Sequence, residues 1–314
     1  MGALIVSALQ GVLPILLMIA LGYCLAHFKW ITEHTGHFLT ELALKVAIPA
    51  MMVNNMNVYF TTESLREAGW GLLAPLLAIA TSYGIGTLVS LAVRVPMGRR
   101  GVFRAMFACA NTVVIGLPVA TALFGEEAVS PALFYFACNT LVFWTVGVMG
   151  IRRDGGGKFS FHLKDLKAIF SPALTSFIVM IALTFADIRL PNFILDTAKS
   201  LGSMATPLCL IYTGFIIQNM GLKNLLHGWD RSSGLVMAGR FVVTPLIVFT
   251  VLSAIRTPEI MRNVYMVQSG MPIMSQTPLV SKAYGSDAGF ASRMVLATTV
   301  FSLIFVPVMR VILG

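Results

Sequence analysis

Two stretches of the sequence place amide or hydroxyl side chains beside glycine and proline within apolar segments. The first runs from Asn111 and Thr112 through Gly116 to Pro118. The second covers residues 268–278 and contains Pro272, Ser275, Gln276, Thr277 and Pro278. Such side chains can bind an anion, and a helix that begins among them adds free N–H groups and the positive end of its dipole. These stretches therefore predict a binding site for a small anion.

The sequence offers no set of residues suited to catalysis or to holding a metal ion. It contains no His-Glu-x-x-His, no paired aspartates and no Gly-x-Ser-x-Gly. An enzyme within the membrane needs a nucleophile with its base, or metal ligands. The cysteines occur singly, without the spacing of metal ligands, at Cys24, Cys109, Cys138 and Cys209. We therefore expect no enzyme activity, no cofactor and no metal.

The elements that must position these stretches are membrane helices. Of the 314 residues, 57% are hydrophobic and only 11% are charged, whereas a soluble domain has roughly 25% charged residues. The mean hydropathy is +0.84. A water-soluble fold cannot bury so much apolar surface, and a disordered chain would be polar and rich in charge. The composition predicts an integral membrane protein.

Apolar segments long enough to cross a bilayer fill most of the chain. A helix needs about 20 apolar residues to span the hydrocarbon layer. Ten segments qualify, at 3–27, 37–57, 68–93, 102–124, 129–151, 167–186, 194–219, 232–255, 260–284 and 289–313. The expected fold is all-α, with ten transmembrane helices and no separate soluble domain.

The distribution of basic residues predicts the orientation. Lys and Arg collect in cytoplasmic loops. With the N-terminus outside, 14 of the 22 basic residues lie on the cytoplasmic side. An even number of spans then places the C-terminus outside as well. The net charge of +9 is explained by these loops, and we expect no nucleic-acid partner.

The two halves of the chain resemble each other at an offset of 158–162 residues. The matching pairs are Pro118 with Pro278, Thr121 with Ser281, Gly125 with Gly285, Pro14 with Pro172, Pro49 with Pro207, and Arg94 with Arg256. Two repeats of five spans each must lie in the membrane with opposite orientation, as in many secondary transporters. We predict a first repeat at 1–151, a cytoplasmic linker rich in glycine and basic residues at 152–166, and an inverted second repeat at 167–314.

The two polar stretches occupy equivalent spans, the fourth and the ninth. Proline removes a backbone donor and clashes with the preceding turn, so both helices should break and cross near Gly116, Pro118, Pro272 and Pro278. Irregular backbone at membrane depth is tolerated where it is buried or lines a cavity. Simple structural kinks are the alternative interpretation.

The segment Asn111–Pro118, followed by Phe124 and Gly125, resembles the fourth-helix signature of the auxin efflux carrier family. The segments Ala47–Ala50 and Arg240–Pro245 resemble that family as well. The family belongs to a wider group with the bile acid–sodium symporters. The short linker resembles that of bacterial members, which implies a cell inner membrane location.

This resemblance implies an elevator-type carrier. Spans 1, 2, 6 and 7 would form a scaffold that dimerises through helices 2 and 7, and the other six spans would move. Asn111, Asn139 and residues around Gln276 would face the substrate. Sodium-coupled relatives have a glutamate in the ninth span, but no acid lies between Arg262 and Lys282 in this chain, which argues against sodium coupling.

Charged residues inside spans give two further expectations. Glu41 and Lys45 are four residues apart, in the favourable order for an ion pair on one helix face, so we expect them to pair. Arg240 has two interpretations: its side chain reaches the cytoplasmic surface, or it neutralises a substrate carboxylate.

Together these patterns predict a secondary transporter of small organic anions, such as malate or malonate, that works by alternating access. The candidate substrate-binding residues are Asn111, Thr112, Asn139, Ser275, Gln276, Thr277 and Arg240. A channel or a sensor built on the same duplicated helices is the alternative.

Overall fold

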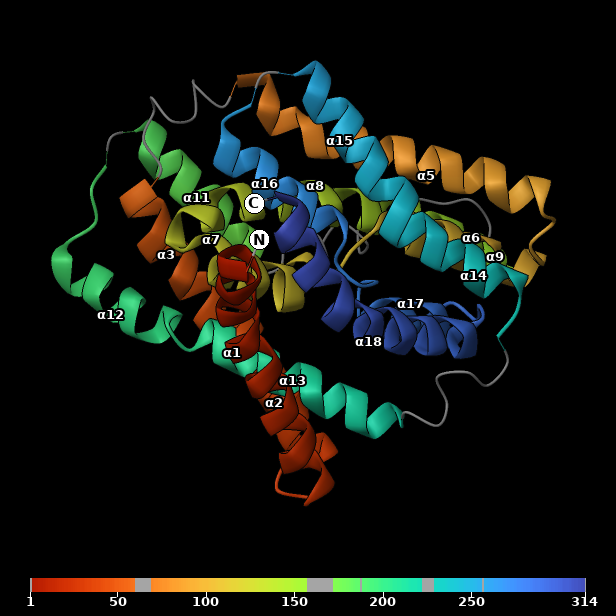
Figure 1. Cartoon of the computed structure of the whole chain (residues 1–314), viewed down its shortest axis with the longest axis horizontal. Coiled ribbons are helices and arrows are strands. Elements are labelled where there is room, and N and C mark those ends of the chain that lie inside the picture. The colour runs from red at the N-terminus through yellow and green to blue at the C-terminus, as the bar shows by residue number, and fades with distance from the viewer. Residues whose placement is uncertain are drawn as a thin grey trace.

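The computed structural model describes residues 2–59, 69–156, 172–186, 188–221, 229–255 and 257–313 (Figure 1). Within these residues the regular structure is helical, apart from a single β-bridge. This confirms the all-α class expected from the composition. Most of the predicted linker at 152–166, and Arg256 of the repeat pairs, lie outside the described residues.

The helices follow one another along the whole chain, several of them joined end to end. The first half contains α1 (Gly2–His27), α2 (Glu33–Leu42), η1 (Ala43–Ala47), α3 (Ile48–Tyr59), η2 (Gly69–Leu73), α5 (Ala74–Ala92), α6 (Met97–Ala108), η3 (Thr112–Gly116), α7 (Leu117–Phe124), η4 (Glu126–Ala128), α8 (Val129–Val142), η5 (Phe143–Gly147) and α9 (Val148–Asp154). The second half contains α11 (Pro172–Phe185), α12 (Asn192–Gly202), α13 (Ala205–Met220), α14 (Arg231–Ala238), η7 (Gly239–Val243), α15 (Thr244–Ala254), α16 (Glu259–Ser269), α17 (Thr277–Ala283) and α18 (Ala288–Leu313).

Five continuous helices in the described residues are long and apolar enough to cross a membrane. They are Gly71–Ala92, Glu126–Asp154, Asn192–Asn219, Arg231–Ala254 and Ala288–Met309. Shorter apolar helices occur at Leu16–His27 and Thr112–Phe124. The fourth and ninth predicted spans lack a single long helix because each is interrupted, at 109–111 and at 270–276.

Three of the four π-helical turns in the described residues end two residues before a proline. These turns are Ala43–Ala47 before Pro49, Thr112–Gly116 before Pro118, and Gly239–Val243 before Pro245. A proline cannot donate a backbone hydrogen bond, and its ring clashes with the carbonyl four residues earlier. The helix responds by widening for one turn, so Pro118 continues a helix that the sequence analysis expected to break there.

The helices form two regions, one in the left and lower middle of Figure 1 and the other toward its right. The glycine-packed region consists of α1, α3, α11, α12 and α13, in which α1 packs along α13, and α3 packs on α11 and α12. A Cβ atom added to Gly22 would lie 2.0 Å from the backbone oxygen of Ile211, and one added to Gly214 would lie 2.0 Å from that of Ile19. The close approach of α1 and α13 therefore requires glycine at both positions.

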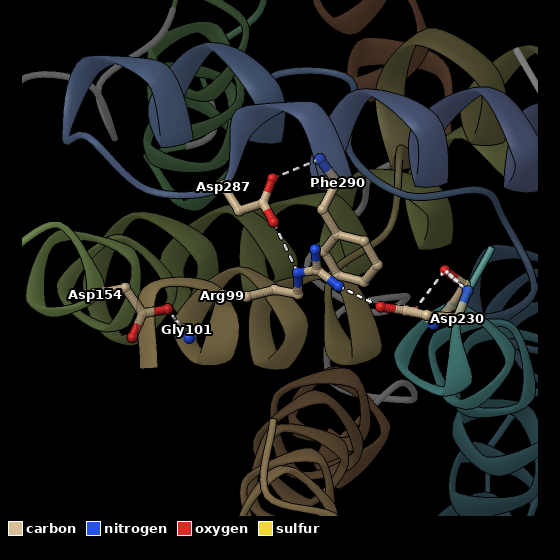
Figure 2. A network of polar contacts seen from close by, with 7 residues as sticks. Arg99, Gly101, Asp154, Asp230, Asp287 and Phe290 are labelled. Atoms are coloured by element: carbon tan, nitrogen blue, oxygen red, sulfur yellow. Dashed lines mark hydrogen bonds and ion pairs between the residues drawn. The ribbon is translucent and has the colours of Figure 1, made fainter. Parts of the chain in front are cut away.

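The ion-paired bundle consists of α5, α6, α9, α14, α15, α17 and α18. Arg99 lies at the start of α6, close to the starts of α14 and α18 (Figure 2). The Nε atom of Arg99 donates to Asp287 at 2.7 Å, and its Nη1 pairs with Asp230. The guanidinium carbon lies 4.3 Å from the centre of the Phe290 ring. One arginine thus ties the beginnings of α6, α14 and α18 together.

The two aspartates of this network also begin helices. Asp230 accepts a hydrogen bond from the backbone of Ser233 at 2.9 Å and caps α14, while Asp287 accepts from the backbone of Phe290 at 2.8 Å at the start of α18. Nearby, the carboxylate of Asp154 accepts from the backbone of Gly101 and joins α9 to α6 (Figure 2).

Candidate functional site

The interrupted helices cross at their breaks. Ala110 and Ile273 form an isolated antiparallel bridge, and the backbone N–H of Asn111 donates to the carbonyl of Pro272 at 2.7 Å. The break between α6 and η3 thus pairs with the break between α16 and α17. Each break satisfies backbone groups of the other, which meets the requirement that buried backbone be hydrogen-bonded.

Side chains from two further helices hold the crossing in place. Asn139 of α8 is fully buried, and its amide accepts from the N–H of Ala110 and donates to its carbonyl, both at 2.9 Å. Thr298 of α18 accepts from the N–H of Ile273 at 3.2 Å. The sequence analysis placed Asn139 beside the substrate. Its amide is instead directed at the backbone of the first break, so it positions Ala110 and Asn111.

Arg240 lies at the ends of both half-helices that lead into the crossing. Its side chain is fully buried, and its guanidinium donates to the carbonyl of Ser269 at 2.5 Å and to that of Phe107 at 3.5 Å. The hydroxyl of Thr244 also donates to the carbonyl of Phe107, at 3.1 Å. Ser269 ends α16, and Phe107 lies in the last turn of α6.

This position differs from both interpretations of Arg240 made from the sequence. The side chain does not reach a surface, and it is not among the residues that line the cavities described below. The last carbonyls of a helix lack partners and carry the negative end of its dipole. A planar guanidinium can satisfy two such ends at once. Arg240 therefore stabilises the crossing by binding the ends of the two helices that lead into it.

A cavity of about 200 Å³, here called the inner cavity, lies against the crossing. Four of the predicted site residues line it, namely Asn111, Thr112, Ser275 and Gln276. Its other lining residues include Lys45, Phe136, Thr140, Trp144, Pro172 and Met274. The amide of Asn111 lies 3.3 Å from the hydroxyl of Ser275 and donates to it across the two breaks. The crossing therefore brings polar groups from both halves of the chain to one wall.

Two polar atoms on the wall of the inner cavity have no hydrogen-bond partner among the described residues. They are the hydroxyl oxygen of Thr140 and the amide oxygen of Gln276, and both are buried. A buried polar atom without a partner is costly, and in native structures it calls for a specific explanation. A bound polar ligand would supply the missing partners.

A second cavity, here called the entrance cavity, has a volume of about 620 Å³ and shares Lys45, Val114, Trp144, Ser275 and Gln276 with the inner cavity. It is also lined by His37, Glu41, Tyr212, Pro278, Lys282 and Ser292. Lys45 and Glu41 form an ion pair, as expected from their spacing. The shared residues make the two cavities neighbours along one route to the crossing.

Other predicted residues lie away from the inner cavity. Thr277 is buried, and its hydroxyl bonds the carbonyl of Met274 at 2.8 Å. Gly116 faces the amide of Gln268, and a Cβ at Gly116 would lie 2.1 Å from that amide oxygen. Pro118 lies within the continuous helix η3–α7, Pro278 lies in the first turn of α17, and Pro272 lies within the second break. Of the four predicted crossover residues, Pro272 therefore contributes to the crossing itself.

Sequence reasoning missed several lining residues. Phe136, Thr140 and Trp144 recur every four residues on α8–η5, which is one helix face. This periodicity was available in the sequence, but the family resemblance pointed to Asn139, the neighbour of Thr140. Lys45 was recognised only as the partner of Glu41, since nothing in the second span indicates that it faces the ninth.

In the described part of the chain, no group of three or more His, Cys, Asp or Glu residues could hold a metal ion. The described cysteines are free thiols. The chemistry available at the crossing is therefore that of amides, hydroxyls, helix N–H groups and one ammonium group.

Comparisons with known proteins cover almost the entire chain. A family model described as membrane transport protein matches residues 7–310. An uncharacterized transporter of Methanocaldococcus jannaschii is 26% identical over 302 residues, which cover 94% of this chain and 95% of the relative. An uncharacterized transporter of Methanothermobacter thermautotrophicus is 24% identical over 308 residues, which cover 97% and 98% of the two chains.

Proposed function

Since the chain belongs to the membrane transport protein family, the family of the auxin efflux carriers, we propose that it is a secondary transporter of small organic anions, carboxylates such as malate or malonate. It is a multi-pass membrane transporter and not an enzyme.

The inner cavity is the observation that carries this proposal. Its wall includes Thr112, Val113 and Val114, the first residues of the helix η3–α7. The N–H groups of a first helical turn have no partner within the helix and favour an anion. Asn111, Ser275 and the unpartnered Gln276 and Thr140 lie around the same space, and the ammonium group of Lys45 supplies the positive charge.

The volume of the cavity favours a small substrate. Pockets for drug-sized ligands measure roughly 300–1,000 Å³, whereas the inner cavity measures about 200 Å³. A carboxylate with a short carbon chain fits such a space. The apolar lining residues Phe136, Trp144 and Met274 would contact the carbon chain, while the crossing would bind the charged end.

We assign alternating access to movement of the ion-paired bundle against the glycine-packed region. In this proposal the glycine-packed region is the scaffold, which dimerises through α2–α3 and α12–α13. The ten spans form two inverted repeats, with both termini outside the cell inner membrane. The entrance cavity would then open on the side of His37 and Lys282, the predicted cytoplasmic side, and the proposal assigns this conformation to an inward-facing state.

Thermal unfolding of the purified protein in detergent tests the proposal against a panel of mono- and dicarboxylates, with and without sodium. A ligand that binds only the folded state stabilises it by about 2.7 kcal/mol at a hundredfold excess over Kd. We expect stabilisation by malate or malonate without sodium, and uptake of the same acid into proteoliposomes. A requirement for sodium would contradict the expected coupling. Stabilisation by none of the acids would overturn the substrate class, and currents beyond carrier rates would favour a channel.

The variant Asn111→Ala tests the position of the site. We expect it to lower transport at unchanged abundance in the membrane, because it removes the amide that links the two breaks on the cavity side. Unchanged uptake by this variant would remove Asn111 from the site.

A further inference from the structure

We propose that Lys45 is the charge-selecting residue of the transporter, and that a substrate carboxylate replaces Glu41 as its partner when the substrate passes from the entrance cavity into the inner cavity. This inference rests on the proposed function and assigns it a specificity residue. Two observations support the inference. Lys45 lines both cavities, and its ion pair with Glu41 is exposed.

Lys45 is the only charged residue among the described residues that line the inner cavity. The rest of that lining is apolar or neutral and polar. An anion that enters such a space loses hydration, and one fixed positive charge is the main compensation available for its carboxylate. The charge of Lys45 should therefore set which substrates can enter.

The entrance cavity presents a different set of charges. His37, Glu41 and Lys45 follow one another at intervals of four residues along α2 and η1, and Lys282 lies on α17. Glu41 lines the entrance cavity but not the inner cavity, whereas Lys45 lines both. A carboxylate that moves inward thus passes Glu41 first and then remains beside Lys45 alone.

The ion pair between Lys45 and Glu41 is suited to exchange. The two side chains are 58% and 45% exposed, and exposed pairs contribute little to stability because water and ions compete with them. Lys45 also lies in the middle of the π-turn Ala43–Ala47, a type of turn that is frequent at functional sites. Replacing Glu41 with a substrate carboxylate as the partner of Lys45 therefore costs little stability.

The test uses the full-length protein in proteoliposomes, with radiolabelled malonate or malate as probe, whichever the wild type transports. The variants are Lys45→Gln, Lys45→Arg, Glu41→Gln and the exchange of both residues, Lys45→Glu with Glu41→Lys. Lys199→Gln is the matched control, because Lys199 is exposed on α12 and lines neither cavity. Thermal unfolding of each variant is measured in parallel.

We expect Lys45→Gln to raise KM about tenfold or more, the loss typical of a charge-assisted hydrogen bond. Lys45→Arg should change KM much less, and Glu41→Gln should lower KM because Lys45 no longer has a competing partner. The exchanged variant keeps an ion pair, so it should unfold like the wild type and yet fail to transport the anion.

Two results would overturn the inference. One is an unchanged KM in Lys45→Gln, and the other is restored transport in the exchanged variant, which would make the ion pair purely structural. Both leave the proposed function intact if Asn111→Ala still lowers uptake. Failure of the wild type to transport any of the acids would instead overturn the proposed function, and with it this inference.

Discussion

The glycine-packed region and the ion-paired bundle hold distant parts of the chain together in different ways. In the first, α1 and α13 approach so closely that Gly22 and Gly214 contact opposing backbone. In the second, Arg99 joins three helix beginnings through Asp230 and Asp287, and Arg240 of the adjoining η7 joins the end of α6 to the end of α16. Close packing at glycine holds the glycine-packed region together, and directional polar bonds hold the ion-paired bundle together.

This difference follows from what each region contains. The interrupted helices of the crossing expose backbone groups and helix ends that apolar packing cannot satisfy, so polar side chains must reach them. Continuous helices satisfy their own backbone, and small residues then allow close packing in a membrane protein. The polar bonds therefore belong to the part of the molecule that carries the site.

The largest expected effect is in the variant Arg240→Met. It would leave the carbonyl of Ser269 without its buried donor and weaken the contact to Phe107. We expect a loss of about 2–3 kcal/mol in unfolding free energy, since the hydrogen bond of a charged donor is lost and a buried carbonyl is left without a partner. Thermal unfolding in detergent measures this loss. Arg240→Lys should recover a part of it, and wild-type stability in Arg240→Met would contradict the role assigned to Arg240.

The next effect tests the glycine-packed region. In Gly214→Ala the new Cβ would lie 2.0 Å from the backbone oxygen of Ile19, so α1 and α13 must separate, at a cost of about 1–3 kcal/mol. Gly84→Ala in α5 is the matched control, because a Cβ there meets no atom within 4 Å. The control should unfold at or above the wild-type temperature, since alanine has a higher helix propensity than glycine. Equal effects in the two variants would remove the distinction between these glycines.

A smaller effect is expected for Arg99→Gln. Arg99 is 20% exposed at its side chain, and its loss leaves both aspartates without their positive partner but with their helix caps. We expect about 1–2 kcal/mol of destabilisation, also measured by thermal unfolding. Arg262→Gln on α16 serves as control, because Arg262 is exposed and forms no ion pair with a described residue. A smaller loss of unfolding free energy in Arg99→Gln than in this control would contradict the role assigned to the ion pairs of Arg99.

The smallest effect is a pH dependence at Asp230. Partial burial opposes ionisation of this carboxylate, but hydrogen bonds from Ser233 and the charge of Arg99 prevail and keep its pKa below the usual value. A folded-state pKa below the unfolded one stabilises the fold above about pH 4, and this stabilisation is lost as the pH falls further through the folded pKa.

Asp230→Asn isolates this contribution, because asparagine still caps a helix. At neutral pH the variant should unfold at a lower temperature than the wild type. The loss in unfolding free energy should be less than about 1 kcal/mol, because the pair is so exposed. The difference should close below pH 4. A difference that stays constant from pH 7 to pH 3 would show that the charge of Asp230 does not contribute.

The sequence was sufficient for the membrane class, the two interrupted segments and the pair of Glu41 with Lys45. Composition, proline with glycine, and helical spacing are local properties of a chain. The family match and the helical structure confirm the membrane class, and the paired breaks confirm that the fourth and ninth segments meet. The ten spans in two repeats remain a prediction.

Side-chain directions could not be derived in the same way. Asn139 and Thr140 are neighbours on α8, but one bonds the backbone of Ala110 and the other faces the inner cavity. Successive residues of a helix point about 100° apart. The sequence does not show which of these directions faces the cavity. Arg240 was misjudged for a related reason, since its partners come from helices far away in the chain.

Arg240 also has a consequence for how the protein can evolve. It belongs to the second half of the chain, yet one of the two carbonyls it binds, that of Phe107, belongs to the first. A gene that encoded the first half alone would produce a helix whose buried end lacks its cation. Each half therefore supplies a group that the other half needs, and selection on Arg240 acts on both.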